Sequence, residues 1–114
     1  MKVACLLLFV SCATPAFADA RGVAKAQVAF GIDVGLRGLW REAIYRWTRA
    51  VEIDPTYAAA YNNLGIGYEH EGELNKAREA YDRALKLEPD NAMIQQNYEL
   101  FKEINDRTTR KDSQ

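Results

Sequence analysis

The sequence predicts an all-α fold, an α-solenoid built from helix-turn-helix units, and two observations carry this prediction. The first is that residues 58–91 contain two runs with helical periodicity. In each run, small and apolar side chains recur every three or four residues, which lines one face of a helix. Gly72 separates the runs, because glycine adopts left-handed backbone angles after a helix at no steric cost. Pro89 ends the second run, since proline cannot continue a helix.

The second observation is that the pattern is repeated. Residues 24–57 match residues 58–91 when the sequence is shifted by 34 positions. The matched pairs are Gly31 with Gly65, Gly38 with Gly72, Ala43 with Ala77, Ala50 with Ala84 and Pro55 with Pro89. A register that holds across a whole unit is typical of stacked-repeat proteins, whose neighbouring units share one core.

These residues resemble the tetratricopeptide repeat family. The family motif has an aromatic residue, a leucine and a glycine on its first helix, small and aromatic residues on its second, and a closing proline. The second unit meets each position, with Tyr61, Leu64, Gly65, Tyr68, Ala77, Tyr81, Ala84 and Pro89. The first unit is a degenerate copy, with Gln27 in place of an aromatic residue and Val34 in place of the tyrosine. The resemblance implies a right-handed α-solenoid of two repeats, whose first helices line a concave side that binds proteins.

The first unit is expected to contain helices at about residues 22–37 and 39–53. Its first helix is the weaker element, because a glycine inside a helix costs about 1 kcal/mol relative to alanine. Gly31 has a packing reason, since it matches Gly65 of the second unit. Gly35 has no packing reason in the repeat pattern, and it predicts a frayed end.

The turns and the C-terminal segment complete the predicted solenoid. After Pro55, Thr56 is a candidate N-cap for the next helix, and Asp90 or Asn91 is a candidate for the last one. Residues 92–107 are expected to form a capping helix with a polar outer face, as the end of a repeat stack requires. Residues 108–114 are predicted to be a disordered polar tail.

Residues 1–18 are predicted to be a signal peptide. Lys2 provides a positive start, residues 3–10 form an apolar run too short to span a bilayer, and the segment ends in Ala16-Phe17-Ala18, a small-x-small motif. We expect cleavage after Ala18, although a second motif ends at Ala20. An alternative is that this segment is a buried helix of the fold.

The two cysteines, Cys5 and Cys12, both lie in this predicted leader. The mature chain would therefore have no disulfide and no thiolate chemistry, although it would enter a compartment that permits disulfides. We expect an exported protein, periplasmic or secreted. An alternative is that Cys12 is lipidated and anchors the protein to a membrane. No later apolar stretch is long enough to span a bilayer.

The composition and the reactive side chains argue against several classes of function. Lysine and arginine number 15 against 16 aspartates and glutamates, so nothing indicates a nucleic-acid interface. His70 is the only histidine, and no spacing pairs it with a nucleophile or with further metal ligands. We therefore expect no enzyme, no metal and no cofactor.

Binding remains as the expected activity. If the first helices line a concave side, as the resemblance implies, counting round them places ten residues there: Val28, Ile32, Leu36, Asn62, Asn63, Ile66, Glu69, His70, Gln96 and Asn97. Asn63 and Asn97 recur one unit apart, and an amide offers both a donor and an acceptor, so the two could hold an extended peptide backbone. The alternative is that the asparagines are ordinary surface residues and the isoleucines contact neighbouring helices.

One binding mode of the family is not expected. In the family that this sequence resembles, members that bind the terminal carboxylate of a peptide use basic residues at fixed positions of the groove. Val28, Ile32, Met93 and Asn97 stand at such positions here and bring no positive charge. Recognition of acidic peptide tails is therefore not predicted.

The sequence thus predicts a non-catalytic adaptor or scaffold in the bacterial envelope, which binds a peptide or helix of a protein partner in its concave groove. A structural role is the alternative: self-association, or permanent assembly into an envelope complex. Its basis is size, because two units and a cap fall short of the three repeats that usually give stability.

Overall fold

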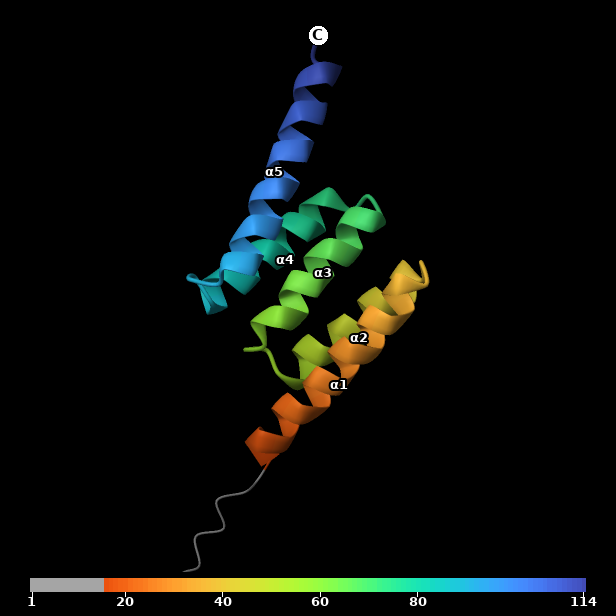
Figure 1. The fold of residues 1–114 in the computed structure, drawn as a ribbon, viewed down its shortest axis with the longest axis vertical. Helices are drawn as coiled ribbons and strands as arrows, with labels where there is room; N and C mark the ends of the chain where they lie inside the picture. The colour runs from red at the N-terminus through yellow and green to blue at the C-terminus, as the bar shows by residue number, and fades with distance from the viewer. Residues whose placement is uncertain (1–15) are drawn as a thin grey trace, which may run out of the picture.

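The structure is a computed structural model that describes residues 16–114 and contains five helices over that range, with no strand (Figure 1). The helices are α1 (Ala16–Leu36), α2 (Trp40–Ile53), α3 (Ala58–His70), α4 (Leu74–Leu87) and α5 (Ala92–Asp112). α1 packs on α2 and α3 packs on α4, so the chain forms two helical hairpins. The hairpins meet through α2 against α3 and α1 against α3, and α5 lies against α4 and α3. The predicted all-helical fold of paired helices is confirmed.

Each hairpin turns at a glycine with left-handed backbone angles. The φ angle is 81° at Gly38 and 72° at Gly72. The residue after each glycine then donates its N–H to a carbonyl five positions back: Leu39 to Val34 at 3.1 Å, and Glu73 to Tyr68 at 2.9 Å. These bonds satisfy carbonyls that the end of the preceding helix leaves without partners. The two matched glycines therefore direct the same tight turn in both units.

Within each hairpin an aromatic ring of the second helix covers a glycine of the first. A Cβ added at Gly31 would lie 2.7 Å from Cδ1 of Trp47, and one added at Gly65 would lie 2.6 Å from Cε1 of Tyr81. Trp47 is 2% exposed and Tyr81 is 1% exposed. Because a methyl group would overlap the ring, only glycine allows this close packing. The spacing that the two units share thus reflects one physical contact made twice.

Gly35 also has a packing reason, contrary to the expectation from the sequence. Its added Cβ would lie 3.2 Å from Cζ3 of Trp40 and 3.5 Å from the Cβ of Ala43. α1 remains helical as far as Leu36, so the predicted fraying is wrong. The physical reason is that the Trp40 ring, at the start of α2, lies across the C-terminal end of α1.

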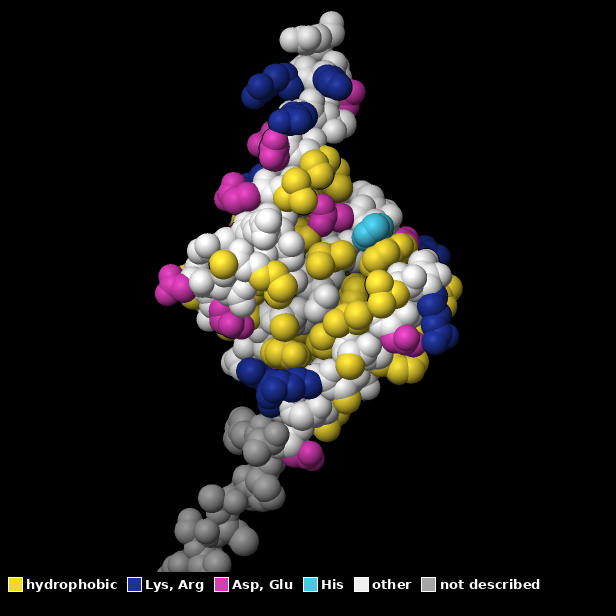
Figure 2. Space-filling model, viewed as in Figure 1, with side chains coloured by type: hydrophobic (Ala, Val, Ile, Leu, Met, Phe, Trp, Pro, Cys, Tyr) yellow, Lys and Arg dark blue, Asp and Glu magenta, His cyan; other side chains and the backbone are white. Residues whose placement is uncertain are grey.

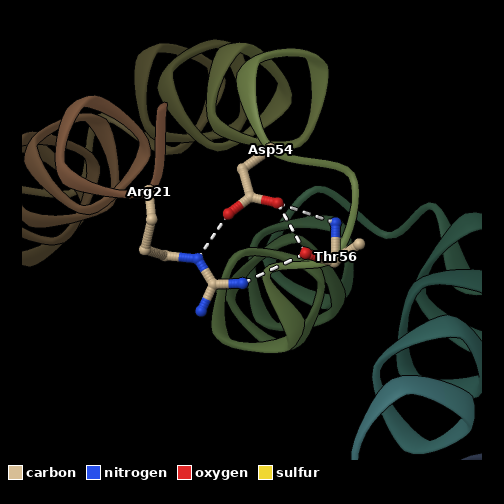
Figure 3. A network of polar contacts seen from close by, with 3 residues as sticks. All are labelled: Arg21, Asp54 and Thr56. Carbon is tan, nitrogen blue, oxygen red and sulfur yellow. Dashed lines mark hydrogen bonds and ion pairs between the residues drawn. The ribbon is translucent and has the colours of Figure 1, made fainter. Parts of the chain in front are cut away.

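The turn between the two hairpins is tied to α1 by a polar network (Figure 3). Arg21 of α1 donates to Asp54 through Nε and to the Thr56 hydroxyl through Nη2, the latter at 3.1 Å. The Thr56 N–H and hydroxyl both donate to Asp54 Oδ1, at 3.0 and 2.7 Å. Thr56 therefore closes an Asx turn and is not the N-cap, which is Tyr57. The hydrogen bond from Arg21 is the largest influence that lowers the pKa of Asp54.

The last helix is capped as expected and ends later than expected. The Oδ1 of Asn91 accepts from the N–H of Ile94 at 3.1 Å, which confirms Asn91 as the N-cap. α5 continues to Asp112, so the predictions of a cap ending at residue 107 and of a disordered tail are wrong. The hydrogen bond from the Thr108 hydroxyl to the Ile104 carbonyl, at 3.0 Å, crosses the predicted boundary. Figure 1 shows this end of α5 projecting beyond the two hairpins.

The N-terminal predictions are only partly covered by the structure. α1 begins at Ala16, so the predicted cleavage motif forms its first turn. Lys2, the apolar run, Cys5 and Cys12 lie outside the described residues, and export and lipidation stay predictions.

Candidate functional site

A band of apolar side chains marks the face formed by α1 and α3. In Figure 2 it runs diagonally across the molecule, over the region where Figure 1 places these two helices side by side. The helices reach this face because the second helices, α2 and α4, pack behind them. The side chains of α1 and α3 that do not enter the hairpin cores are therefore presented to solvent.

A hollow of about 160 Å³ lies within this band. Its lining comes from three helices and consists of Ile32, Gly35 and Leu36 of α1, Trp40 and Trp47 of α2, and Asn63 and Ile66 of α3. An apolar cavity of about 150 Å³ is large enough for a benzene-sized group. None of the lining side chains titrates, and Asn63 is its one side chain with hydrogen-bonding groups on both oxygen and nitrogen. The hollow is thus suited to holding an apolar side chain, not to acid–base chemistry.

Four of the ten predicted site residues meet in this hollow. Ile32 is 42% exposed and Leu36 is 83% exposed, while Asn63 and Ile66 are partly exposed. Large apolar side chains that remain this open on one continuous face are the usual mark of an interaction surface. Their binding role stays a prediction, but their placement on the face of the first helices is as expected.

Val28 and Asn62 are buried, so their expected places on the accessible surface are wrong. Val28 is 6% exposed, and its carbonyl accepts from the Trp47 Nε1 at 3.2 Å. Asn62 is 3% exposed, and its Oδ1 accepts from the Asn97 Nδ2 at 3.1 Å. Both occupy the same position of the repeat, which turns toward neighbouring helices.

The predicted series of asparagines is largely engaged within the chain. The Nδ2 of Asn63 donates to the Ala59 carbonyl at 2.9 Å, and that of Asn97 donates to Asn62. One donor of each amide is therefore already used, and a partner would meet mainly the Asn63 oxygen at the hollow. Gln96 is exposed on α5 and does not line the hollow.

Glu69 and His70 lie at the end of α3, beyond Ile66. Glu69 accepts a hydrogen bond from the Tyr81 hydroxyl at 2.5 Å. The His70 ring stacks on Trp40, with ring centroids 3.7 Å apart and planes 4° apart. The Trp40 ring is thereby held where it lines the hollow.

The sequence did not identify the two tryptophans as lining residues. Trp47 is 2% exposed, and its large ring passes over Gly31 and forms part of the wall of the hollow. A signal was present, because tryptophan stands where the second unit has the smaller Tyr81. Trp40 has no such signal, since its contact with Gly35 lies outside the repeat motif.

Other classes of site are not found within the described range. No group of three or more potential metal ligands among histidine, cysteine, aspartate and glutamate occurs in residues 16–114. Nor does any helix of that part of the chain have the length and apolar character that a bilayer crossing requires.

Comparison with known proteins identifies repeats of one family within this chain. The family described as "Tetratricopeptide repeat" matches residues 58–91, and the family described as "TPR repeat" matches residues 36–70. The second match joins α2 to α3, so it covers the junction between the hairpins.

Among curated proteins, PYG7, a chloroplastic tetratricopeptide repeat domain-containing protein of Arabidopsis thaliana, is 28% identical over 75% of this chain and 28% of its own length. A probable UDP-N-acetylglucosamine–peptide N-acetylglucosaminyltransferase of Petunia hybrida, SPINDLY, is 34% identical over 60% of the chain and 7% of its own. Small glutamine-rich tetratricopeptide repeat-containing protein 2 of Saccharomyces cerevisiae is 38% identical over 46% of this chain and 16% of its own length.

The chain spans less than a third of the length of each of these relatives. The catalytic domain of the Petunia transferase lies outside the matched region, so the likeness extends to repeats and not to chemistry. The matched segments contain the glycine-directed turn at Gly72 and the aromatic packing on Gly65 described above. The two family matches and the stacked hairpins together show that residues 36–91 of this chain consist of tetratricopeptide repeats.

Proposed function

We propose that this protein is a non-catalytic adaptor that binds a segment of a protein partner on the face formed by α1 and α3. The observation that carries this proposal is the apolar hollow between the two helices, open to solvent and lined by Ile32, Leu36 and Ile66. Tetratricopeptide repeats generally serve protein–protein interaction, which supports the same conclusion.

The hollow favours one anchoring side chain from the partner. Burying a leucine-sized or phenylalanine-sized group contributes about 1.5–3 kcal/mol, which is enough to dominate the affinity of a short segment. Asn63 stands at the edge of the hollow and offers an acceptor to the backbone of the same segment. The partner is therefore a peptide or an exposed helix that presents an apolar residue.

Site-specific photocrosslinking in the native cells tests this proposal. A benzophenone amino acid replaces Leu36, which lines the hollow, and in a separate variant it replaces Leu74, which is exposed on α4. We expect one discrete adduct from position 36 and none from position 74. The proposal is wrong if position 36 gives no adduct, or if both positions give the same adduct.

We further propose that the adaptor works in the bacterial envelope after removal of residues 1–18. The basis is the charged start, short apolar run and small-x-small motif of the sequence. N-terminal sequencing of the protein from the envelope fraction should begin at Asp19. If the chain retains Met1, it is not exported by this route. If the protein associates with the membrane and Cys12→Ser abolishes this association, the protein is lipid-anchored through Cys12.

The alternative is a structural subunit that associates with its own copies. Phe30 of α1 is 47% exposed and Tyr45 of α2 is 54% exposed, and neither lines the hollow. The Arg46 guanidinium lies 4.4 Å from the centroid of the Phe30 ring and 5.5 Å from that of the Tyr45 ring. A second copy could cover this apolar surface at the free end of the stack. Light scattering at tens of micromolar tests this role, with the Phe30→Glu variant as the comparison. If the wild-type protein and the variant are both monomers, self-association is excluded.

A further inference from the structure

Glu69 brings a carboxylate to the helix face that lines the hollow. Asn63, Ile66 and Glu69 follow one another at steps of three residues, so their side chains form one oblique row on the surface of α3. Glu69 is partly exposed, and it lies about 4.5 Å farther along the helix axis than Ile66. Ile66 lines the hollow and also packs against the core cluster that contains Tyr81, the hydrogen-bond partner of Glu69.

Tyr81 holds this carboxylate in place. Its hydroxyl donates to Oε2 of Glu69 at 2.5 Å, and its ring is fixed over Gly65 and against Tyr98, with ring centroids 5.6 Å apart. Burial, followed by the hydrogen bond to Glu69, raises the pKa of Tyr81 above its usual value, so the hydroxyl stays protonated at physiological pH. One carboxylate oxygen is thus fixed, and the other remains able to accept from a partner.

Glu69 lacks a cation within the described part of the chain. Its neighbour Glu71 pairs with Arg41 at 3.8 Å, and Glu73 pairs with Lys76 at 3.3 Å. Over residues 19–114, no lysine or arginine nitrogen lies within the 4.0 Å of an ion pair with Glu69. A partly buried, preorganised carboxylate beside an apolar pocket is complementary to a cation carried by the partner.

We propose that the partner segment carries a lysine or arginine next to its apolar anchor, and that this cation pairs with Glu69 while the anchor fills the hollow. This inference rests on the proposed function. An extended segment advances about 3.3 Å per residue, so the cation lies one or two residues from the anchor. Glu69 then selects basic partner segments over acidic ones, because a carboxylate of the partner opposite Glu69 would be repelled by its like charge.

The experiment is a selection of random linear peptides, displayed on phage, against the full chain and against its E69Q variant. We expect peptides selected on the full chain to combine an aliphatic or aromatic residue with a lysine or arginine one or two positions away. Peptides selected on E69Q should keep the apolar residue and lose the bias toward cations. E79Q is the matched control, because Glu79 is exposed on α4 and lies outside the hollow, and it should select as the full chain does.

One selected peptide is then synthesised with lysine, glutamine or glutamate at the cationic position, and its affinity is measured by calorimetry. E69Q should weaken binding of the lysine peptide about tenfold and leave that of the glutamine peptide unchanged. Y81F keeps the ring and removes the hydroxyl, so it should weaken only the lysine peptide, by a smaller factor. Circular dichroism verifies that each variant is folded.

The outcomes separate the two proposals. Peptides without a nearby cation, or a lysine peptide that binds E69Q as tightly as the full chain, overturn the role of Glu69 and leave the adaptor function standing. If an Ile66→Glu variant selects the same peptides as the full chain, the peptides do not bind in the hollow. That outcome overturns the adaptor function and this inference with it.

Discussion

The Nδ2 of Asn97 donates a hydrogen bond to the Oδ1 of Asn62 across 3.1 Å, and this bond joins α5 to α3. Asn62 is 3% exposed, so its amide depends on partners within the protein. The bond spans two residues that lie 35 positions apart, about one repeat. This hydrogen bond therefore attaches α5, the last helix, to α3.

Replacing Asn97 with alanine should destabilise the fold, because it leaves the buried oxygen of Asn62 without its donor. The expected loss in the free energy of unfolding is about 1–3 kcal/mol. Urea denaturation followed by circular dichroism measures it. Gln96→Ala is the matched control, since Gln96 is exposed on the same helix, and it should change the free energy by less than about 0.5 kcal/mol. Equal losses in both variants would show that this hydrogen bond does not stabilise the stack.

Alanine at Gly31 or Gly65 should each destabilise the protein by about 1–3 kcal/mol, because the added methyl group overlaps the ring of Trp47 or Tyr81. Gly22→Ala provides the comparison. Nothing lies within 4 Å of its added Cβ, and it stands inside α1, so alanine should stabilise by about 0.5–1 kcal/mol. Thermal unfolding of the three variants measures these opposite signs. A destabilising Gly22→Ala together with neutral changes at the other two positions would contradict the packing described.

The stability of the first hairpin should depend on pH through Asp54. Its pKa is lowered in the folded state, chiefly by the hydrogen bond from Arg21, so its contribution is present above the unfolded pKa and lost as the pH falls. Wild type should therefore be more stable than Asp54→Asn at neutral pH, and the difference should shrink below about pH 4. Urea denaturation across this range measures it. Asp33→Asn, which breaks an ion pair with Arg37 whose side chains are at least 60% exposed, should show little difference at any pH.

Residues 108–114 should be dispensable for stability. They are exposed and continue α5 beyond its buried contacts, the last of which is Phe101. A chain ending at Arg107 should unfold within about 0.5 kcal/mol of the full chain. The truncated chain should also lose helical signal in circular dichroism, because residues 108–112 are helical. An unchanged helical signal would show that this segment is not a helix in solution.

The repeat register predicted the hairpins correctly because it reports contacts that both units make. Gly31 and Gly65 match in sequence since each lies under an aromatic ring, and Gly38 and Gly72 match since each turns a helix. Each of these requirements involves one turn or one pair of residues. A single sequence that contains two repeat units therefore reveals them.

What the sequence did not predict depends on neighbours that the motif does not encode. Counting round a helix placed Val28 and Asn62 on the concave side, but that position lies at the border between groove and core. Val28 belongs to the buried cluster that contains Trp47, and Asn62 accepts a hydrogen bond from the Asn97 amide. Likewise, the Trp40 ring gives Gly35 a role and forms a wall of the hollow, although Trp40 lies outside the motif. The sequence pattern therefore predicts which helix face carries the site. It does not predict the depth of the hollow, because that depends on individual aromatic side chains.

The central claim is that a partner places an apolar side chain in the hollow between α1 and α3. Chemical-shift mapping by NMR tests it most directly, with the isotopically labelled chain titrated with a selected peptide. The account predicts the largest changes at the amides of Ile32, Asn63 and Ile66 and at the indole N–H groups of Trp40 and Trp47, with Ile66→Glu abolishing them. Changes confined to the outer faces of α2 and α4 would contradict it.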